Sequence, residues 1–226
     1  MAGRKRKKKR NRYRKHIIIW ILLLLVTAHF CGGKLQQTLH KMPGETDWKL
    51  IVVNKWNTIP DGYQTELTTL SNGKQVDSRI YPALQDLFDA MRADGIYPIV
   101  REGYRTTTDQ QSILDDKIKA YEQEGLSSLL AKKMASEWVA APGTSEHQLG
   151  IAVDINADKT KSTNDEVYTW LAEHAWEYGF ILRYPKDKEN VTGTGYEPWH
   201  YRYVGKEAAK EIWQEGCCLE EYVTQN

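Results

Sequence analysis

Apolar residues follow two patterns along this chain, a helical repeat and short runs bounded by turn residues. A helix is predicted from Ser78 to Ala93, because four apolar residues recur there at i, i+3, i+4 and i+7 and would form one buried face. These residues are Leu84, Leu87, Phe88 and Met91. A capping-box motif, Thr163 to Glu166, predicts the start of another helix that ends at Gly179. Further helices are predicted over residues 108–124, 127–140 and 206–215.

Short runs with strand composition lie between these helices. They cover residues 48–54, 96–100, 149–155, 180–184 and 199–204. A turn is predicted at residues 57–62 and a glycine-rich loop at residues 190–195. The strands and helices mix without the regularity of βαβ units. Their order therefore predicts an α+β fold, in which helices pack on a small and largely antiparallel sheet.

The N-terminus carries a different pattern, a basic head followed by an apolar segment. The head covers residues 1–16 and the apolar segment residues 17–31, with an uninterrupted run of 12 residues from Ile17 to Ala28. Because Lys and Arg keep their flank in the cytoplasm, the head is predicted to be cytoplasmic and the rest of the chain to lie outside. The run is shorter than the roughly 20 residues of a spanning helix. Two alternatives stay open, a signal anchor and a signal peptide cleaved after Ala28.

The remainder reads as one domain behind a linker. Residues 32–47 are polar and contain Gly and Pro, which predicts a linker, and residues 48–226 are predicted to fold as a single domain. The net charge of +1 hides an asymmetry, because ten Lys or Arg lie within residues 1–15 and the rest carries 21 basic against 30 acidic residues. A net acidic domain does not suit a phosphate backbone. Nucleic acid is therefore not an expected partner.

The cysteine content predicts no disulfide framework. The chain has three cysteines, Cys31, Cys217 and Cys218, and a disulfide between adjacent residues is strained. We expect free or partly buried thiols near the C-terminus.

Two histidines and two carboxylates stand out as candidate chemistry: His147, Asp154, Glu197 and His200. A catalytic zinc ion takes three protein ligands of this kind and one water. Two His and one Asp would fill the three positions and leave the other carboxylate as general base. The spacing permits this arrangement without requiring it, since residues seven apart on a plain strand point to opposite faces. His147 must then precede the strand of Asp154, and an irregular segment must lead from Glu197 to His200.

Three motifs resemble those of the VanY-like D-alanyl-D-alanine carboxypeptidases, a family related to zinc D-Ala-D-Ala dipeptidases and L,D-carboxypeptidases. SEHQLGIAVD, which starts at Ser145, fits the family's SxHxxGxAxD. EPWHYRYVG, which starts at Glu197, fits ExWHxRYVG, and the segment that starts at Glu102 fits SGYRSxxxQ. The likeness covers the chain from about Trp48 to the end. It implies a zinc D,D-peptidase-like fold.

The resemblance also implies roles for individual residues. His147, Asp154 and His200 would bind Zn²⁺, and Glu197 would take the proton from the metal-bound water. The implied reaction is removal of the terminal D-Ala from peptidoglycan stem peptides, outside a bacterial cytoplasmic membrane to which the N-terminal segment attaches the domain, or after secretion if that segment is cleaved.

Three further residues are implied to meet the substrate. Arg105 would stabilise the oxyanion or hold the terminal carboxylate, because its guanidinium offers paired donors. Ser145 and Gln110 would be substrate contacts. The chain departs from the family pattern at Glu102 and Thr106, where Ser is usual, which leaves the fine specificity open.

Other functions on the same fold remain as alternatives. One is an L,D-carboxypeptidase or an endopeptidase, and another is a peptidoglycan-binding module without turnover. Glu197 argues against the last, because a purely structural zinc site would have a fourth protein ligand and no use for a base. The sequence does not indicate an oligomeric state.

Overall fold

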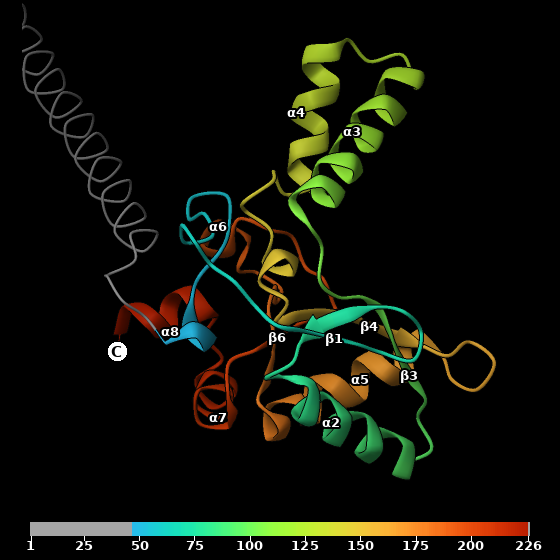
Figure 1. The fold of residues 1–226 in the computed structure, drawn as a ribbon, viewed down its shortest axis with the longest axis vertical. Coiled ribbons are helices and arrows are strands. Elements are labelled where there is room, and N and C mark those ends of the chain that lie inside the picture. Colours follow the sequence, from blue (N-terminus) through green and yellow to red (C-terminus); the bar gives the residue numbers. More distant parts are fainter. Residues whose placement is uncertain (1–46, 226) are drawn as a thin grey trace, which may run out of the picture. The chain divides into compact units, whose positions relative to one another are not determined.

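The computed structural model describes residues 47–225 of the chain (Figure 1). The predicted basic head, the apolar segment with Cys31 and nearly all of the linker lie outside the described residues, so those predictions stay predictions. Within residues 47–225, no helix is both long enough and apolar enough to cross a bilayer.

A four-stranded sheet with the strand order β3-β4-β6-β5 organises the fold. Its strands are β3 (Pro98–Glu102), β4 (Ala152–Ala157), β6 (His200–Tyr203) and β5 (Phe180–Leu182). Every pairing in this sheet is antiparallel. The predicted α+β fold with a small antiparallel sheet is confirmed.

Helices pack on the sheet and create two apolar cores. The main helices are α2 (Tyr81–Ala93), α3 (Thr107–Gln123), α4 (Ser128–Trp138), α5 (Asn164–His174), α7 (Lys206–Glu215) and α8 (Leu219–Gln225). The larger core lies between α2, α5 and the sheet, and it holds all four residues of the predicted apolar face. The second core joins α7 and α8 to Ile181 and Val204. In contrast, α3 and α4 pack on each other as a hairpin that projects from the sheet (Figure 1).

Several predicted elements have different ends in the structure. The capping box at Thr163 is present, but α5 ends at His174 and a 3-10 turn, η3 (Ala175–Tyr178), continues to Gly179. The predicted loop at residues 190–195 begins within a short helix, α6 (Glu189–Thr192). The expected free thiols are confirmed, with Cys217 partly buried and Cys218 buried.

The strand predicted at residues 48–54 is wrong. The segment begins with a 3-10 turn, η1 (Trp48–Leu50), capped by Asp47, and its one β pairing is an isolated antiparallel bridge between Asn54 and Asn57. Its backbone is satisfied by a side chain, because Arg202 Nη2 donates to the carbonyl oxygens of Lys49 at 3.1 Å and Ile51 at 2.8 Å. A buried guanidinium therefore replaces the neighbouring strand that a local pattern would suggest.

The strand predicted at residues 149–155 begins later, at Ala152. Residues before it form a 3-10 turn, η2 (Glu146–Leu149), which ends at Gly150 with φ +75°. This left-handed conformation favours glycine and redirects the chain into β4. Leu149 is fully buried in the turn, so its apolar character did not reveal where the strand starts.

A hairpin that was not predicted supports the two loops before β4 and after β3. It consists of β1 (Leu67–Thr69) and β2 (Gln75–Asp77). The Gln75 carbonyl accepts from Tyr104 N at 2.6 Å, and the Gly150 carbonyl accepts from Asp77 N at 2.9 Å. A Cβ on Gly103 would lie 2.2 Å from the Gln75 oxygen, so only glycine fits there.

We expect Gly103→Ala to lower the free energy of unfolding by about 1–3 kcal/mol, because the added methyl group forces the β2 backbone away. Urea unfolding followed by circular dichroism measures this change. The matched control is Gly195→Ala, because a Cβ there meets its nearest atom at an ordinary 3.6 Å. Equal stability of the two variants would contradict this prediction, because it would mean that the β1–β2 hairpin moves away from the added methyl group at no cost.

Candidate metal and active site

All seven residues singled out from the sequence line one cavity of about 280 Å³. They are Arg105, Gln110, Ser145, His147, Asp154, Glu197 and His200. They belong to α3, the η2 turn and the residue before it, strands β4 and β6, and the segments that follow β3 and precede β6. The fold therefore gathers at one place residues that lie up to 95 positions apart in the sequence.

Asp154 and His200 meet across the sheet. They are directly opposite each other in the β4–β6 register, and His200 Nδ1 lies 3.0 Å from Asp154 Oδ1. The segment before β6 is irregular, as the sequence required, with a turn at Pro198. His200 N donates to the Glu197 carbonyl at 3.2 Å within this turn.

His147 approaches the pair from the η2 turn. Its Nδ1 bonds to the Gly103 carbonyl oxygen at 2.8 Å, which leaves Nε2 to face Asp154 Oδ1 at 3.4 Å. The His147 carbonyl in turn accepts from Arg105 N at 3.2 Å. The arginine motif and the first histidine motif are thus tied together by backbone groups.

The three residues form a donor set that fits zinc. One ligand atom from each of His147, Asp154 and His200 can be chosen so that all lie within 4.8 Å of one another. Two imidazole nitrogens and a carboxylate oxygen are the donors of many catalytic zinc sites. Among the described residues, this is the one group of His, Cys, Asp and Glu placed closely enough to hold a metal ion.

The electrostatics of the cluster also suit a cation. Although burial raises it, the neighbouring histidines hold the pKa of Asp154 well below its usual range. Burial disfavours a charged imidazole, but Asp154, Glu146 and Glu197 together raise the pKa of His200 to about 9. Positive charge is therefore strongly stabilised between these side chains.

Glu197 lies beside the donor set without belonging to it. Its Oε2 is 3.7 Å from His200 Nδ1, and its backbone N donates to the Tyr184 carbonyl at 3.2 Å. Burial raises the pKa of the Glu197 carboxyl, although His200 opposes the shift. A carboxylate with a raised pKa next to a metal site is well suited to proton transfer.

Arg105 is held at the edge of the donor set. Its Nη1 donates to Gln110 Oε1 at 3.3 Å, and its guanidinium lies 3.8 Å from Glu102 and 3.9 Å from Asp154. Glu102, one of the two departures from the family motif, also pairs with Lys74 at 2.9 Å. The acid at this position therefore adds an anchor for Arg105 beside the cavity.

Gln110 and Thr106 have structural partners that the sequence did not reveal. Gln110 is buried and donates from Nε2 to the Ala140 carbonyl at 2.7 Å while it accepts from Arg105, so its amide is engaged at both ends. Thr106 caps α3, because its hydroxyl accepts from Asp109 N at 3.1 Å. A substrate contact by Gln110 would thus compete with internal bonds. Ser145 lines the cavity and is buried.

The sequence did not single out the walls of the cavity. The lining also includes Lys55, together with Ile113 and Trp138 of the α3–α4 hairpin. Trp138 is 72% exposed although it is a large aromatic residue. Only the fold shows that this exposed ring borders the predicted site.

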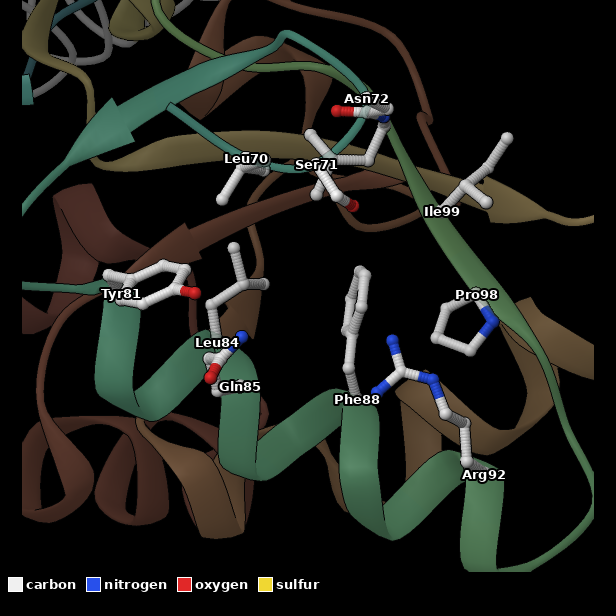
Figure 2. Close-up of a pocket in the computed structure, with 11 residues that line it drawn as sticks. Leu70, Ser71, Asn72, Tyr81, Leu84, Gln85, Phe88, Arg92, Pro98 and Ile99 are labelled. Atoms are coloured by element: carbon white, nitrogen blue, oxygen red, sulfur yellow. The ribbon is translucent and has the colours of Figure 1, made fainter. Parts of the chain in front are cut away.

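A second cavity, of about 240 Å³, lies between α2, β3 and the turn of the β1–β2 hairpin (Figure 2). Its lining is mixed, because apolar residues such as Phe88 and Ile99 alternate with polar ones such as Asn72, and Arg92 lies at one end. It contains none of the residues predicted for the site.

Comparisons with known proteins agree with this geometry. The VanY family, described as D-alanyl-D-alanine carboxypeptidase, matches residues 73–206. A D-alanyl-D-alanine carboxypeptidase of Enterococcus faecalis is 58% identical over 186 residues, which cover 82% of this chain and 69% of that protein. The putative carboxypeptidase YodJ of Bacillus subtilis is 35% identical over 189 residues, 76% of this chain and 66% of that protein.

Solved structures of VanY enzymes and of an LD-carboxypeptidase also match this chain. VanYB in complex with D-alanine-D-alanine is 59% identical, with a TM-score of 0.77 and coverage of 80% of this chain and 99% of that chain. A mutant of a vancomycin-resistance D,D-pentapeptidase VanY in complex with Zn(II) is 60% identical, with a TM-score of 0.76 over 78% of this chain and 99% of that chain. The LD-carboxypeptidase LdcB is 31% identical, with a TM-score of 0.66 over 82% and 95%.

We expect His200→Ala to lower the zinc content sharply from one ion per chain, because it removes one of three ligands. Metal analysis of the purified domain after dialysis measures the content. His174→Ala is the matched control, since that histidine is 41% exposed and lies on α5, outside the donor set. Full zinc occupancy in the His200 variant would refute the ligand assignment.

Proposed function

The chain belongs to the VanY family of D-alanyl-D-alanine carboxypeptidases, and from this we propose how its cavity hydrolyses the terminal D-Ala of a peptidoglycan stem peptide. It is a zinc-dependent D,D-carboxypeptidase that acts on peptidoglycan precursors. The observation that carries the mechanism is the convergence of three ligand atoms within 4.8 Å, with the Glu197 carboxylate beside them.

The donor set assigns one atom of each residue to the metal. His147 would bind through Nε2, Asp154 through its carboxylate and His200 through Nδ1, because these atoms face one another. Zinc held there supplies a Lewis acid that lowers the pKa of a bound water to about 7 and polarises a carbonyl group. The protein supplies the rest of the reaction.

Glu197 is the general base. It removes a proton from the attacking water and delivers a proton to the amine of the leaving D-Ala, so the peptide C–N bond breaks without a covalent enzyme intermediate. Its partial burial keeps the carboxyl close to the donor set, and its raised pKa favours proton transfer. Because no acyl-enzyme forms, a penicillin-type acylating inhibitor has no nucleophile to trap.

Arg105 orients the substrate. Its side chain is 18% exposed, and its guanidinium is fixed by Gln110 and Glu102, so little conformational entropy is lost when it binds an anion. It would hold the terminal carboxylate of the peptide or stabilise the oxyanion. Ser145 would contact the substrate from the wall of the cavity.

The sequence identities to solved structures favour D,D specificity over the L,D alternative. The VanY structures are 59–60% identical to this chain, whereas the L,D-carboxypeptidases LdcB and DacB are 31–33% identical. A non-catalytic binding module would not need the carboxylate of Glu197 beside an open donor set.

The N-terminal 31 residues would place this domain outside a bacterial cytoplasmic membrane. The basic head and the apolar run that follows it support this proposal. Both the signal anchor and the cleaved signal peptide lead to the same side of the membrane.

Glu197→Gln should keep zinc near the wild-type level while activity falls by about 10² to 10⁴-fold or more, because an amide cannot take a proton from water. Release of D-Ala from a muramyl pentapeptide and metal analysis of the same sample measure both quantities. The control is Glu173→Gln, an exposed carboxylate on α5. Loss of zinc would make Glu197 a ligand, and survival of both zinc and turnover would contradict the mechanism.

Removal of residues 1–31 should give a soluble, folded and active domain, since the predicted linker separates targeting from catalysis. Gel filtration and the D-Ala release assay on residues 32–226 test this. An insoluble or inactive product would place the N-terminal segment in the fold of the enzyme.

A further inference from the structure

Four charged side chains without solvent exposure lie behind the donor set. They are Glu146, Arg183, Arg202 and Glu220. Burial of charges costs several kcal/mol per ion, and ion pairs in such places seldom repay this cost as stability. A geometric role therefore explains these residues better than a stabilising one.

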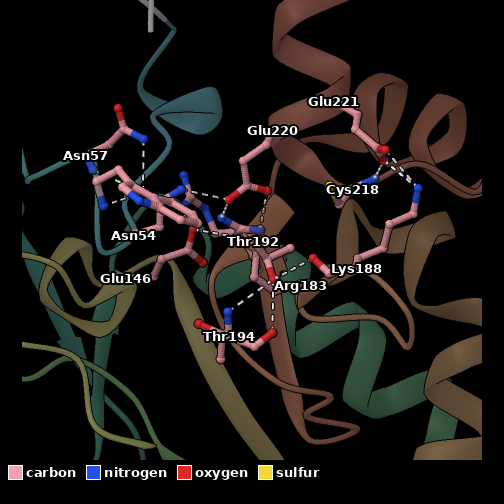
Figure 3. Close-up of polar contacts among 12 residues, drawn as sticks. Asn54, Asn57, Glu146, Arg183, Lys188, Thr192, Thr194, Cys218, Glu220 and Glu221 are labelled. Carbon is pink, nitrogen blue, oxygen red and sulfur yellow. Dashed lines mark hydrogen bonds and ion pairs between the residues drawn. The ribbon is translucent and has the colours of Figure 1, made fainter. Parts of the chain in front are cut away.

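The contacts of this network are asymmetric around Glu146 (Figure 3). Arg183 Nε donates to Glu146 Oε1 at 2.7 Å, and Arg202 Nη1 lies 2.8 Å from the same oxygen. Arg183 also forms a bidentate pair with Glu220, at 2.8 and 2.6 Å. Both guanidinium groups thus hold one oxygen of Glu146 and leave the other oxygen unused.

The unused oxygen faces a metal ligand. Glu146 Oε2 is buried without a hydrogen-bond partner, and so is His200 Nε2. These two atoms lie 3.7 Å apart. The other nitrogen of His200, Nδ1, faces Asp154. Buried polar atoms without partners are rare, and here two of them oppose each other.

We propose that Glu146 is a positioning residue that accepts a hydrogen bond from His200 Nε2–H and so keeps the Nδ1 lone pair directed at the metal. This rests on the proposed zinc site. An imidazole that binds metal through one nitrogen carries its proton on the other, and an acceptor there fixes both the tautomer and the ring orientation. A shift of less than about 1 Å in either side chain brings the pair to hydrogen-bond distance.

The network extends the metal site to segments far from the family motifs. Asn54 Nδ2 donates to Glu220 Oε1 at 3.0 Å, and Asn54 Oδ1 accepts from Asn57 Nδ2 at 2.9 Å (Figure 3). Asn54 precedes the family match at residues 73–206, and Glu220 on α8 follows it. The C-terminal helix therefore holds Arg183, which holds Glu146, which orients His200.

The test is zinc affinity, measured by competition with a chromophoric chelator. Glu146→Gln should raise the zinc Kd by about 10 to 100-fold, the usual cost of losing such a partner. Glu220→Gln should raise the Kd less, because Glu220 reaches Glu146 only through Arg183. Glu221→Gln is the matched control, because this partly buried neighbour on α8 pairs with Lys188, outside the network around Glu146, and should leave the Kd unchanged.

A readout in the wild-type zinc-loaded protein separates positioning from a general loss of stability. Imidazole ¹⁵N NMR should show His200 with its proton on Nε2, and this proton should exchange slowly with water. In a folded Glu146→Gln protein the same resonance should shift and exchange faster. If the Glu146→Gln protein does not fold, the tautomer of His200 in the wild-type protein still tests the proposal.

Two results would overturn the inference. One is an unchanged zinc Kd in folded Glu146→Gln, and the other is a proton on Nδ1 of His200 in the zinc-loaded wild type. Either result leaves the proposed function intact if the wild type binds zinc and releases D-Ala. Failure of the wild type to bind zinc at His147, Asp154 and His200 would instead contradict the proposed function itself.

Discussion

The antiparallel register of β4 and β6 is the constraint on which the site depends. It places Asp154 opposite His200 on neighbouring strands, where cross-strand side chains are close enough to share one ion. A slip of one residue would turn one of these side chains to the other face of the sheet. His147 has no such support from a strand, and it reaches the pair because the Gly103 carbonyl holds its ring. Gly103 is in turn fixed against the β1–β2 hairpin, so a peripheral element helps to set the position of a metal ligand.

The domain combines two kinds of interior. Apolar cores on α2, α5, α7 and α8 supply the burial that stabilises the fold. Four buried charged side chains lie beside them and pair with one another: Glu146, Arg183, Arg202 and Glu220. Such a network favours one arrangement of its members because few alternatives satisfy every group. Rigidity is useful here, since a catalytic metal site tolerates little displacement of its ligands.

Local sequence patterns correctly predicted the elements that are determined by residues close together in the sequence. The buried face of α2 and the capping box of α5 follow from spacing alone, and both are present in the structure. The segment at residues 48–54 was misread because its partner, Arg202, lies about 150 positions away in the sequence. The start of β4 depends on the left-handed conformation of Gly150, which apolar periodicity does not report. Among the site residues, the motifs supplied the identities. They did not reveal which nitrogen of each histidine is free, or that Glu146, which resembles an ordinary surface acid within its motif, is completely buried.

The most direct test of this account is the position and coordination of the metal. Anomalous diffraction at the zinc absorption edge, from crystals of the zinc-loaded domain, locates the ion independently of any assumed ligand. The account predicts a single strong peak bonded to His147 Nε2, the Asp154 carboxylate and His200 Nδ1, with Glu197 close by but not bonded. A peak bonded to His200 Nε2 or to Glu197, or one outside this cavity, would contradict it.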